Sequence, residues 1–170
     1  MIHRYGLISD THGHLHPRVL EHFAGVDAIF HAGDVGGDPV IVELEAVAPT
    51  RAVAGNVDAG GVALPPMRVL ELPFGKLVLT HSHLVEPTGS DPERLARHFA
   101  SQKPRMILFG HSHQQYVRLY KDIWLVNPGP ATKPRFHERP SIVMMTWDSE
   151  RDSFGFEFIP LDWKEVGSQE

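Results

Sequence analysis

Residues 5–34 read YGLISDTHGHLHPRVLEHFAGVDAIFHAGD and contain two short apolar segments separated by a helix-like segment. The apolar segments, 5–9 and 26–31, have the length and the polar or glycine ends of buried strands. Between them, residues 17–24 begin with proline and place apolar side chains at helical spacing. This order predicts two parallel strands joined by a right-handed crossover through a helix.

The same order continues beyond this stretch. Asp38 is suited to cap a helix and Pro39 to take its first position, which predicts a helix over 38–47. A strand-like segment at 51–54 follows the predicted helix. The first third of the chain is therefore expected to form a β-α-β-α-β unit with parallel strands.

The rest of the chain is richer in alternating, strand-like segments. Residues 68–72 and 76–80 flank a Pro-Phe-Gly turn, which predicts a hairpin, and a helix is expected over about 90–101. Further strands are expected at 106–109, 115–120, 122–126, 141–147 and 154–159. We expect the four strands after residue 115 to be antiparallel members of a second sheet, and the chain to be frayed from about Gly167.

Length and composition agree with one ordinary globular domain. The chain has 170 residues, of which 42% are hydrophobic and 22% charged, and no segment is apolar for long enough to cross a bilayer. We therefore expect a single domain spanning residues 1–170 with an α/β (α+β) fold. Its architecture would be a four-layer αββα sandwich of two mixed β-sheets flanked by helices.

Charge and cysteine content narrow the function. The formal net charge of −5 argues against general nucleic-acid binding, which usually needs a basic face. The chain has no cysteine and begins without the pattern of a signal peptide, so we expect a cytoplasmic protein without disulfides or membrane attachment. It has 12 histidines, most of them in or beside five short polar clusters.

Each of these clusters directly follows one of five predicted strands. They are Asp10-Thr11-His12, Gly33-Asp34, Gly55-Asn56, Thr80-His81 and Gly110-His111-Ser112-His113. In open α/β sheets, ligands bind at the carboxyl ends of the strands, so the clusters should meet at one edge. Seven oxygen and nitrogen donors at that edge can hold two metal ions.

Each cluster also has an ordinary structural explanation when taken by itself. Asp10 could cap a helix or turn, and Asp34 and Asn56 beside glycines could be turn residues. Most single histidines are exposed or hydrogen-bonded, although two histidines in His111-Ser112-His113 are harder to explain in this way. The joint occurrence of all five clusters after strands favours a metal site over five unrelated turns.

The ordered set D-x-H, G-D, G-N, H-x-H and G-H-x-H resembles the calcineurin-like metallophosphoesterase superfamily, and in detail its small bacterial and archaeal phosphodiesterases. The resemblance spans residues 10 to 113, and the β-rich region after them also fits. It implies an αββα sandwich. It also implies that Asp10, His12, Asp34 and His113 hold one metal ion, and that Asp34, Asn56, His81 and His111 hold the other, with Asp34 bridging.

The chain departs from the family pattern at two positions. Val57 stands where many relatives carry a histidine that protonates the leaving group, and Pro130 replaces the serine of an Asn-Pro-Gly-Ser turn. His14 and His83 lie beside predicted ligands and are the candidates for the missing proton donor. Both are also compatible with a role as a surface residue or as a hydrogen-bond partner of a ligand.

These residues predict a dinuclear-metal phosphoesterase, in the first place a phosphodiesterase acting on a small phosphoester. Two divalent ions can clamp phosphate oxygens and lower the pKa of a shared water, whose hydroxide would attack phosphorus. The mixed nitrogen and oxygen donors suit manganese, iron, nickel, cobalt or zinc, and manganese is the ion that the family favours. Without the usual proton donor, we expect a steep preference for good leaving groups.

Three other functions remain open at this stage. The same site could serve a phosphomonoesterase or a nucleotide-specific diesterase, since Arg51, Arg68 and Arg135 cannot be placed from the sequence. A non-catalytic scaffold is a second alternative, because a eukaryotic retromer subunit resembles this family. A metal-dependent amidohydrolase is disfavoured by the Asp10-Thr-His12 opening and the short chain. Exposed strand edges after residue 115 would allow a homo-oligomer.

Overall fold

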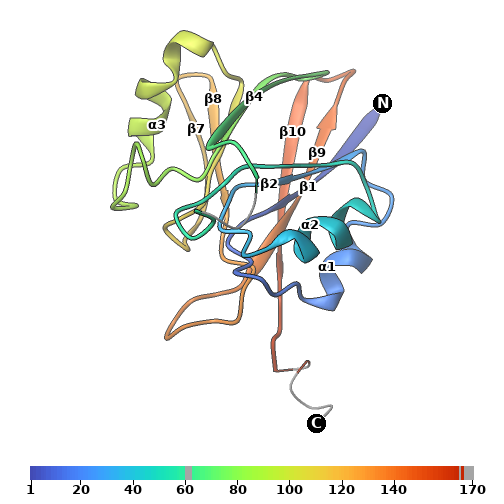
Figure 1. The fold of residues 1–170 in the computed structure, drawn as a ribbon. Coiled ribbons are helices and arrows are strands. Elements are labelled where there is room, and N and C mark those ends of the chain that lie inside the picture. Colours follow the sequence, from blue (N-terminus) through green and yellow to red (C-terminus); the bar gives the residue numbers. More distant parts are fainter. Residues whose placement is uncertain (60–62, 165, 167–170) are drawn as a thin grey trace.

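The computed structural model describes residues 1–59, 63–164 and 166. It contains two five-stranded sheets packed face to face (Figure 1). The first sheet has the order β10-β9-β1-β2-β3 and consists of β1 (Ile2–Ile8), β2 (Ala28–His31), β3 (Thr50–Ala52), β9 (Ser141–Asp148) and β10 (Ser153–Pro160). The second has the order β4-β5-β6-β8-β7 and consists of β4 (Met67–Leu72), β5 (Gly75–Thr80), β6 (Met106–Leu108), β7 (Gln115–Tyr120) and β8 (Ile123–Pro128).

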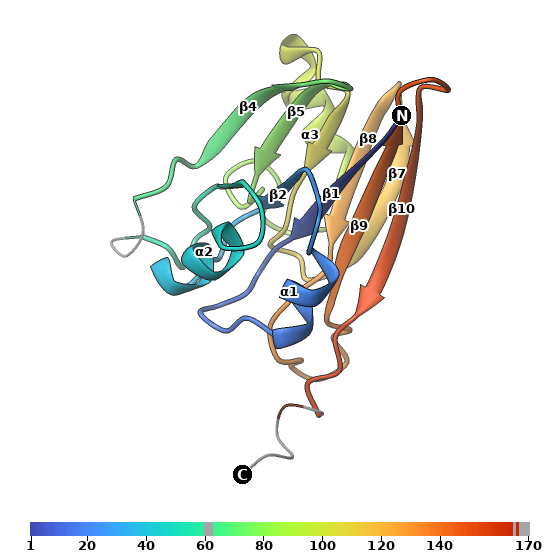
Figure 2. The same cartoon turned by 90° about the vertical axis from the view of Figure 1, so that its right-hand side faces the viewer.

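Short helices cover the outer faces of both sheets and complete the αββα sandwich that the sequence predicts. The helices α1 (Pro17–His22) and α2 (Asp38–Glu45) pack on the first sheet, and α3 (Glu93–His98) with a 3₁₀ turn at Ala100–Gln102 packs on the second (Figure 2). Within the described residues, none of these helices has the length and apolarity needed to cross a membrane.

The predicted β-α-β-α-β unit is confirmed, because β1, β2 and β3 are parallel neighbours joined through α1 and α2. The predicted hairpin is also confirmed, since β4 and β5 pair in antiparallel register with Leu72 opposite Gly75. Parallel strands that share one sheet end at the same edge, and this alignment positions the loops after β1, β2 and β3 together.

The predicted composition of the second sheet is wrong for its last two strands. β9 and β10 belong to the first sheet, where β9 pairs antiparallel with β1, and β8 is parallel to β6. The alternation of β9 shows that both of its faces are buried, with Val143 facing the other sheet and Ile142 facing the helices. An alternating pattern indicates which residues share a face, but it does not indicate which strand lies alongside.

The helix ends also differ slightly from the prediction. Gly37 precedes the helix at the cap position and Asp38 is its first residue, so Asp38 does not cap α2. The third helix begins at Glu93 and gives way to the 3₁₀ turn after His98, which makes it shorter than predicted. The predicted frayed end from about Gly167 lies outside the described residues.

Close packing fixes α1 against the first sheet at Gly6. This residue of β1 faces the Phe23 ring, and a Cβ atom added at Gly6 would lie 2.8 Å from three ring carbons. Both residues belong to the layer between α1 and β1, where Ile8, Val19 and Phe23 are fully buried.

We expect Gly6→Ala to lower the free energy of unfolding by about 1–3 kcal/mol, the usual cost of overpacking. Urea denaturation of Gly6→Ala, Phe23→Leu and the double variant measures this cost. Because Leu leaves space where the ring stood, the cost of Gly6→Ala should fall by at least half in the Phe23→Leu background. Additive effects of the two substitutions would contradict the proposed contact.

Candidate metal centre

The ends of five strands bring the seven predicted ligands to one edge of the sandwich. Asp10 and His12 follow β1, Asp34 follows β2, Asn56 follows β3, His81 follows β5, and His111 and His113 follow β6. Two groups of metal-type donors are close enough to share an ion, namely Asp10 with His12 and His113, and Asp10 with Asp34 and His81.

The first group surrounds the carboxylate of Asp10. His113 Nε2 lies 3.3 Å from Asp10 Oδ1 and 3.4 Å from His12 Nε2. His12 Nε2 in turn lies 3.8 Å from Asp34 Oδ2. Four donors that the family resemblance assigns to one ion are therefore neighbours.

The second group lies on the other side of Asp34. His81 Nε2 is 3.2 Å from Asp34 Oδ2 and 3.0 Å from Asn56 Oδ1, and His111 Nδ1 is 3.2 Å from the same Asn56 oxygen. Asp34 lies near His12 as well as His81, and Asp10 belongs to both groups, so these two carboxylates lie between the two sets of histidines.

The outer hydrogen bonds of three histidines fix which ring nitrogen can bind a cation. His81 Nδ1 lies 2.8 Å from the carbonyl of Ala32, and His111 Nε2 lies 3.0 Å from the carbonyl of Pro87. A carbonyl only accepts, so each of these nitrogens must donate, and the other nitrogen of a neutral ring carries a lone pair. The lone pairs of both rings then face oxygen acceptors at the centre of the site.

His113 repeats this arrangement with a carboxylate. Its Nδ1 lies 2.7 Å from Glu138 Oε1, which leaves Nε2 facing Asp10. Histidines that bind metals are commonly oriented in this way by a carboxylate or carbonyl. The sequence did not reveal the role of Glu138, because 25 residues separate it from His113.

The charges of the site also favour a bound cation. Asp10 is fully buried, and its Oδ1 makes no hydrogen bond within the part of the chain that the structure describes. Burial raises the pKa of Asp34, but the hydrogen bond with His81, the charge of His81, the Val57 N–H and the charge of His12 together outweigh it and lower the pKa to about 2. Contact with Asp10 raises the pKa of His113 to about 9. Acceptors this close together need either protons or metal ions between them, so these residues fit a pair of divalent ions.

The backbone is strained where the ligands converge. Five of the seven predicted ligands have left-handed backbone conformations, with φ between 49° and 74°: Asp10, His12, Asp34, His111 and His113. Residues other than glycine rarely adopt this conformation, and such strain is typically found at functional sites.

A buried histidine holds two of the ligand loops in place. Thr11 Oγ1 donates to the carbonyl of Val35, so His31 Nε2, 2.9 Å away, must donate to Thr11 Oγ1. His31 Nδ1 accepts from the Gly33 N–H. Because the ring is fully buried, its pKa is lowered to about 4, and the neutral ring connects the loop of Asp10 with the loop of Asp34.

Asp58 supports the same loops from the other side. Its carboxylate accepts hydrogen bonds from the backbone N–H groups of Val35, Gly36 and Gly55 at 2.8–3.1 Å. It is almost fully buried, although it directly follows Val57, the position at which relatives carry a histidine. Its bond to Gly55 is local, whereas its bonds to Val35 and Gly36 reach residues more than twenty positions away, which the sequence does not indicate.

The two predicted proton donors have different surroundings. His83 lies beside the site, with its ring centroid 5.4 Å from that of His81 and 6.1 Å from that of His111. Its Nδ1 is buried without a hydrogen-bond partner among the described residues. His14 is exposed, and no side-chain contact connects it with the ligands in the part of the chain that the structure describes.

The Asn127-Pro128-Gly129-Pro130 segment is hydrogen-bonded to the loop that carries His111 and His113. The Asn127 amide donates to the carbonyl of Gly110 and to Ser112 Oγ, and Asn127 Oδ1 accepts from the Gly129 N–H. The carbonyl of Pro130 accepts from the Ser141 N–H, which closes the loop between β8 and β9. Pro130 thus takes part through its backbone, and the segment is the end of β8 and the start of a longer loop, not a tight turn directly before a strand.

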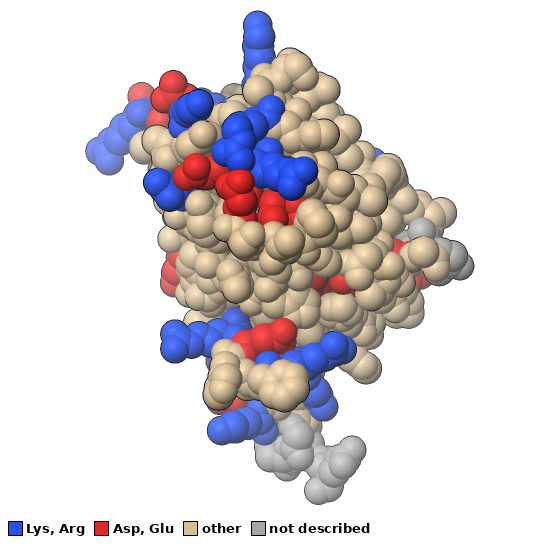
Figure 3. Space-filling model, turned by 90° about the vertical axis from the view of Figure 1, so that its left-hand side faces the viewer, with Lys and Arg blue, Asp and Glu red and all other residues tan. Residues whose placement is uncertain are grey.

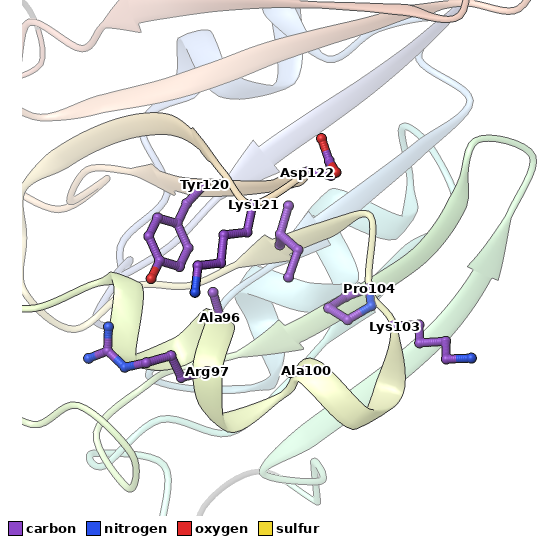
Figure 4. A pocket seen from close by; sticks show the side chains of 9 residues that line it. Ala96, Arg97, Ala100, Lys103, Pro104, Tyr120, Lys121 and Asp122 are labelled. Carbon is purple, nitrogen blue, oxygen red and sulfur yellow. The ribbon is translucent and has the colours of Figure 1, made fainter.

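A separate hollow of about 370 Å³ lies between α3 and the β7–β8 turn (Figure 4). Arg97, Lys103 and Lys121 are among the residues that line it, and none of the predicted ligands is. It lies at the far end of β7 from the donor groups, which makes it distinct from the metal centre.

Two groups of acidic, amide and imidazole donors at the strand ends of a two-sheet sandwich define a metallophosphoesterase-type site. The chain belongs to the calcineurin-like phosphoesterase superfamily, whose domain model matches residues 4–150. A probable metallophosphoesterase of Methanothermobacter thermautotrophicus is 34% identical over 152 residues, which cover 86% of this chain and 87% of the relative.

Solved structures show the same fold. A Streptococcus pneumoniae protein described as a predicted phosphoesterase superposes with a TM-score of 0.77 at 27% identity, over 95% of this chain and 91% of that one. Vacuolar Protein Sorting 29 of Cryptosporidium parvum superposes with a TM-score of 0.74 at 20% identity, over 94% and 97% of the two chains. The second likeness concerns the fold alone.

The titration of His31 should affect stability in acid. Its pKa is about 4 in the folded protein and about 6.5 when unfolded, so the unfolded chain takes up the proton first. Stability should therefore fall as the pH drops from about 6.5 towards 4, by about 3 kcal/mol from this residue. His31→Gln keeps a donor for Thr11 and cannot titrate, so urea denaturation at pH 7 and pH 4, with metal chelated, should show a correspondingly smaller loss. An equal loss in both proteins would exclude this role.

Proposed function

We infer that this protein is a dinuclear-metal phosphoesterase that acts chiefly on phosphodiesters. The observation that carries this proposal is the fixed orientation of His81, His111 and His113. Each ring donates outward, to Ala32, Pro87 or Glu138, and presents its lone pair to the centre of the site. Convergent lone pairs can coordinate a cation, whereas histidines on a solvated surface do not need to be oriented in this way.

The donors divide into two proposed binding positions that share Asp34. Asp10, His12 and His113 would complete one position, and Asn56, His81 and His111 the other. Divalent ions bound there would neutralise phosphate charge and lower the pKa of water at neutral pH. The chain's own contribution is to hold these donors rigidly, since the buried His31 and Asp58 connect the loops that carry them.

The distribution of arginines supports a diester, which carries one negative charge, over a monoester, which carries about two. Arg51 and Arg68 donate to backbone carbonyls of β3, Thr50 and Ala52 respectively. Arg135 lies nearer, because its charge contributes to the lowered pKa of His12, after burial as the main cause. Of these three arginines, only Arg135 acts on a donor of the site, which fits a singly charged ester.

We further propose manganese as the ion in the protein's working state and the cytosol as its location. Imidazole together with carboxylate and amide oxygen suits manganese and the later first-row metals better than magnesium. A purely structural scaffold is the remaining alternative. The complete set of donors argues against it, because none of the seven positions has lost its ligand-type side chain.

Hydrolysis of bis(p-nitrophenyl) phosphate by chelator-treated protein, with manganese, nickel, zinc or magnesium added back, tests the function. We expect turnover only with added metal, highest with manganese, and a loss of at least 10²-fold in kcat for Asp34→Asn. Asp38→Asn, an exposed carboxyl at the start of α2, is the matched control and should keep its activity. A folded protein that shows no turnover with any metal would favour the scaffold.

We propose His83 over His14 as the group that assists the leaving group. Burial, and then its neighbours His81 and His111, lower the pKa of His83, so little of it is protonated at neutral pH and its assistance is weak. Wild-type protein should therefore hydrolyse methyl p-nitrophenyl phosphate much faster than methyl phenyl phosphate. His83→Ala should lower kcat on the phenyl ester by about 10-fold or more and on the nitrophenyl ester by less than threefold. The reverse ranking, with His14→Ala giving the larger effect on the phenyl ester, would exclude this assignment.

A further inference from the structure

The segment between β8 and β9 carries a concentration of positive charge. Residues 133–139 read KPRFHER and contain Lys133, Arg135 and Arg139 against a single acid. The whole chain has a net charge of −5, so this segment is unlike the average surface. Figure 3 shows Lys and Arg side chains gathered, around a few acidic ones, toward the lower end of one face of the molecule. We call residues 133–139 the basic loop.

Glu138 attaches the basic loop to the metal centre. One oxygen of its carboxylate lies 2.7 Å from His113 Nδ1, and the other accepts the backbone N–H of Arg135 at 3.0 Å. Arg135 also receives a return hydrogen bond, since its carbonyl accepts the Glu138 N–H. The middle of the loop is therefore held within two or three residues of a group that contacts a proposed ligand, and two residues of chain span at most about 7 Å.

Phe136 is presented to solvent from the middle of this loop. Its side chain is the most exposed of the large hydrophobic side chains in the described part of the chain, and its backbone is left-handed, with φ 56°. The neighbouring Arg135 is also exposed, and its guanidinium has no hydrogen-bond or ion-pair partner among the described residues. A bulky residue held in strained backbone, with its ring in water, lowers stability without any compensating contact, and such strain commonly serves a ligand.

The space beside the loop is polar and leads to a proposed ligand. A hollow of about 210 Å³ lies between the loop and the start of β7, and its lining includes His113, Gln114, His137 and Arg139. Hydroxyl groups and ester oxygens can be hydrogen-bonded there by the amide, imidazole and guanidinium groups.

We propose that the basic loop determines specificity, with Phe136 stacking on a flat aromatic group of the substrate and Arg135 binding its phosphate. This inference rests on the proposed phosphodiesterase function of the same site. A phosphoester that carries a planar ring one sugar away from phosphorus, as a nucleotide does, matches an exposed phenyl ring and a neighbouring arginine on a loop that borders a polar hollow. Stacking of a base on an aromatic side chain gains enough affinity for a preference of about tenfold.

Two esters with the same leaving group test the preference. Thymidine 5′-(p-nitrophenyl phosphate) and methyl p-nitrophenyl phosphate both release nitrophenolate, and only the first carries a base. We expect wild-type kcat/KM to be at least about tenfold higher for the thymidine ester, mainly through KM. Phe136→Ala should bring the ratio of the two kcat/KM values close to one, and Phe136→Tyr should restore it. Leu119→Ala, an exposed apolar residue near the far end of β7, is the control and should leave the ratio unchanged.

Binding without turnover gives an independent measurement. In the presence of a chelator, NMR titration should show adenosine monophosphate binding about tenfold more tightly than ribose 5-phosphate, which has no base. Phe136→Ala should remove this difference. Arg135→Gln should weaken both ligands by similar factors and reduce the dependence of binding on salt.

The outcomes separate this inference from the proposed function. Metal-dependent turnover of both esters at equal kcat/KM, in wild type and in Phe136→Ala, would overturn the specificity of the loop and leave the phosphodiesterase intact. No turnover of either ester would overturn the phosphodiesterase, and the binding ratio would then decide the role of the loop. Phe136→Ala could instead leave the ratio of the two kcat/KM values as it is in wild type and change the oligomeric state measured by sedimentation. This result would show that the ring contacts another copy of the chain and would overturn the inference.

Discussion

The arrangement of the loops at the strand ends depends on one buried carboxylate, that of Asp10. Asp10 is fully buried, its backbone binds the carbonyl of Gly33 and the N–H of Thr132, and its carboxylate accepts the N–H of His111. One residue thus connects the loops after β1, β2, β6 and β8. Burying a charge without a partner costs several kcal/mol. The fold can accept that cost at Asp10 because the neighbouring imidazole and carboxylate groups allow a cation to share its charge.

This convergence limits what the neighbouring residues can be. A Cβ atom at Gly33 would lie 2.8 Å from the His81 ring, and one at Gly110 would collide with Ser9 Oγ. The ligand loops can approach one another this closely only where side chains are absent. The left-handed backbone of five ligands has the same origin, since a chain that leaves a strand must reverse sharply to turn its side chain back toward the sheet edge. Neutral His31 and the Asp58 carboxylate then hold the loops in this conformation through hydrogen bonds to their backbone.

The sequence predicted those features that depend on neighbouring residues. Short sequence patterns predict the strands, the crossover helices and the ligand clusters that contain Asp10 and His111. They do so because the end of a strand and the loop after it are contiguous in the chain. The sheet to which β9 belongs was predicted wrongly, since its pairing with β1 joins residues almost 140 positions apart, Leu7 and Val143 for example. Glu138 was not identified for the same reason. A glutamate in a basic segment looks like an ordinary surface residue until the fold places it 2.7 Å from a ring nitrogen of His113.

The fold by itself does not distinguish an enzyme from a sorting protein, because a protein named for vacuolar sorting shares it at 20% identity. The proposed activity rests instead on how the histidines of this chain are held. Two of the three outward hydrogen bonds are accepted by the backbone carbonyls of Ala32 and Pro87. A residue of any type at these two positions would provide such a carbonyl. The third requires a particular side chain, that of Glu138, which also forms part of the basic loop through its bond to Arg135. A displacement of the loop would therefore alter the orientation of His113, and a change at His113 would move the loop. Any ligand that orders residues 133–139 is thereby coupled to the donors of the metal centre, which is an arrangement suited to a catalyst that must position its substrate against its ions.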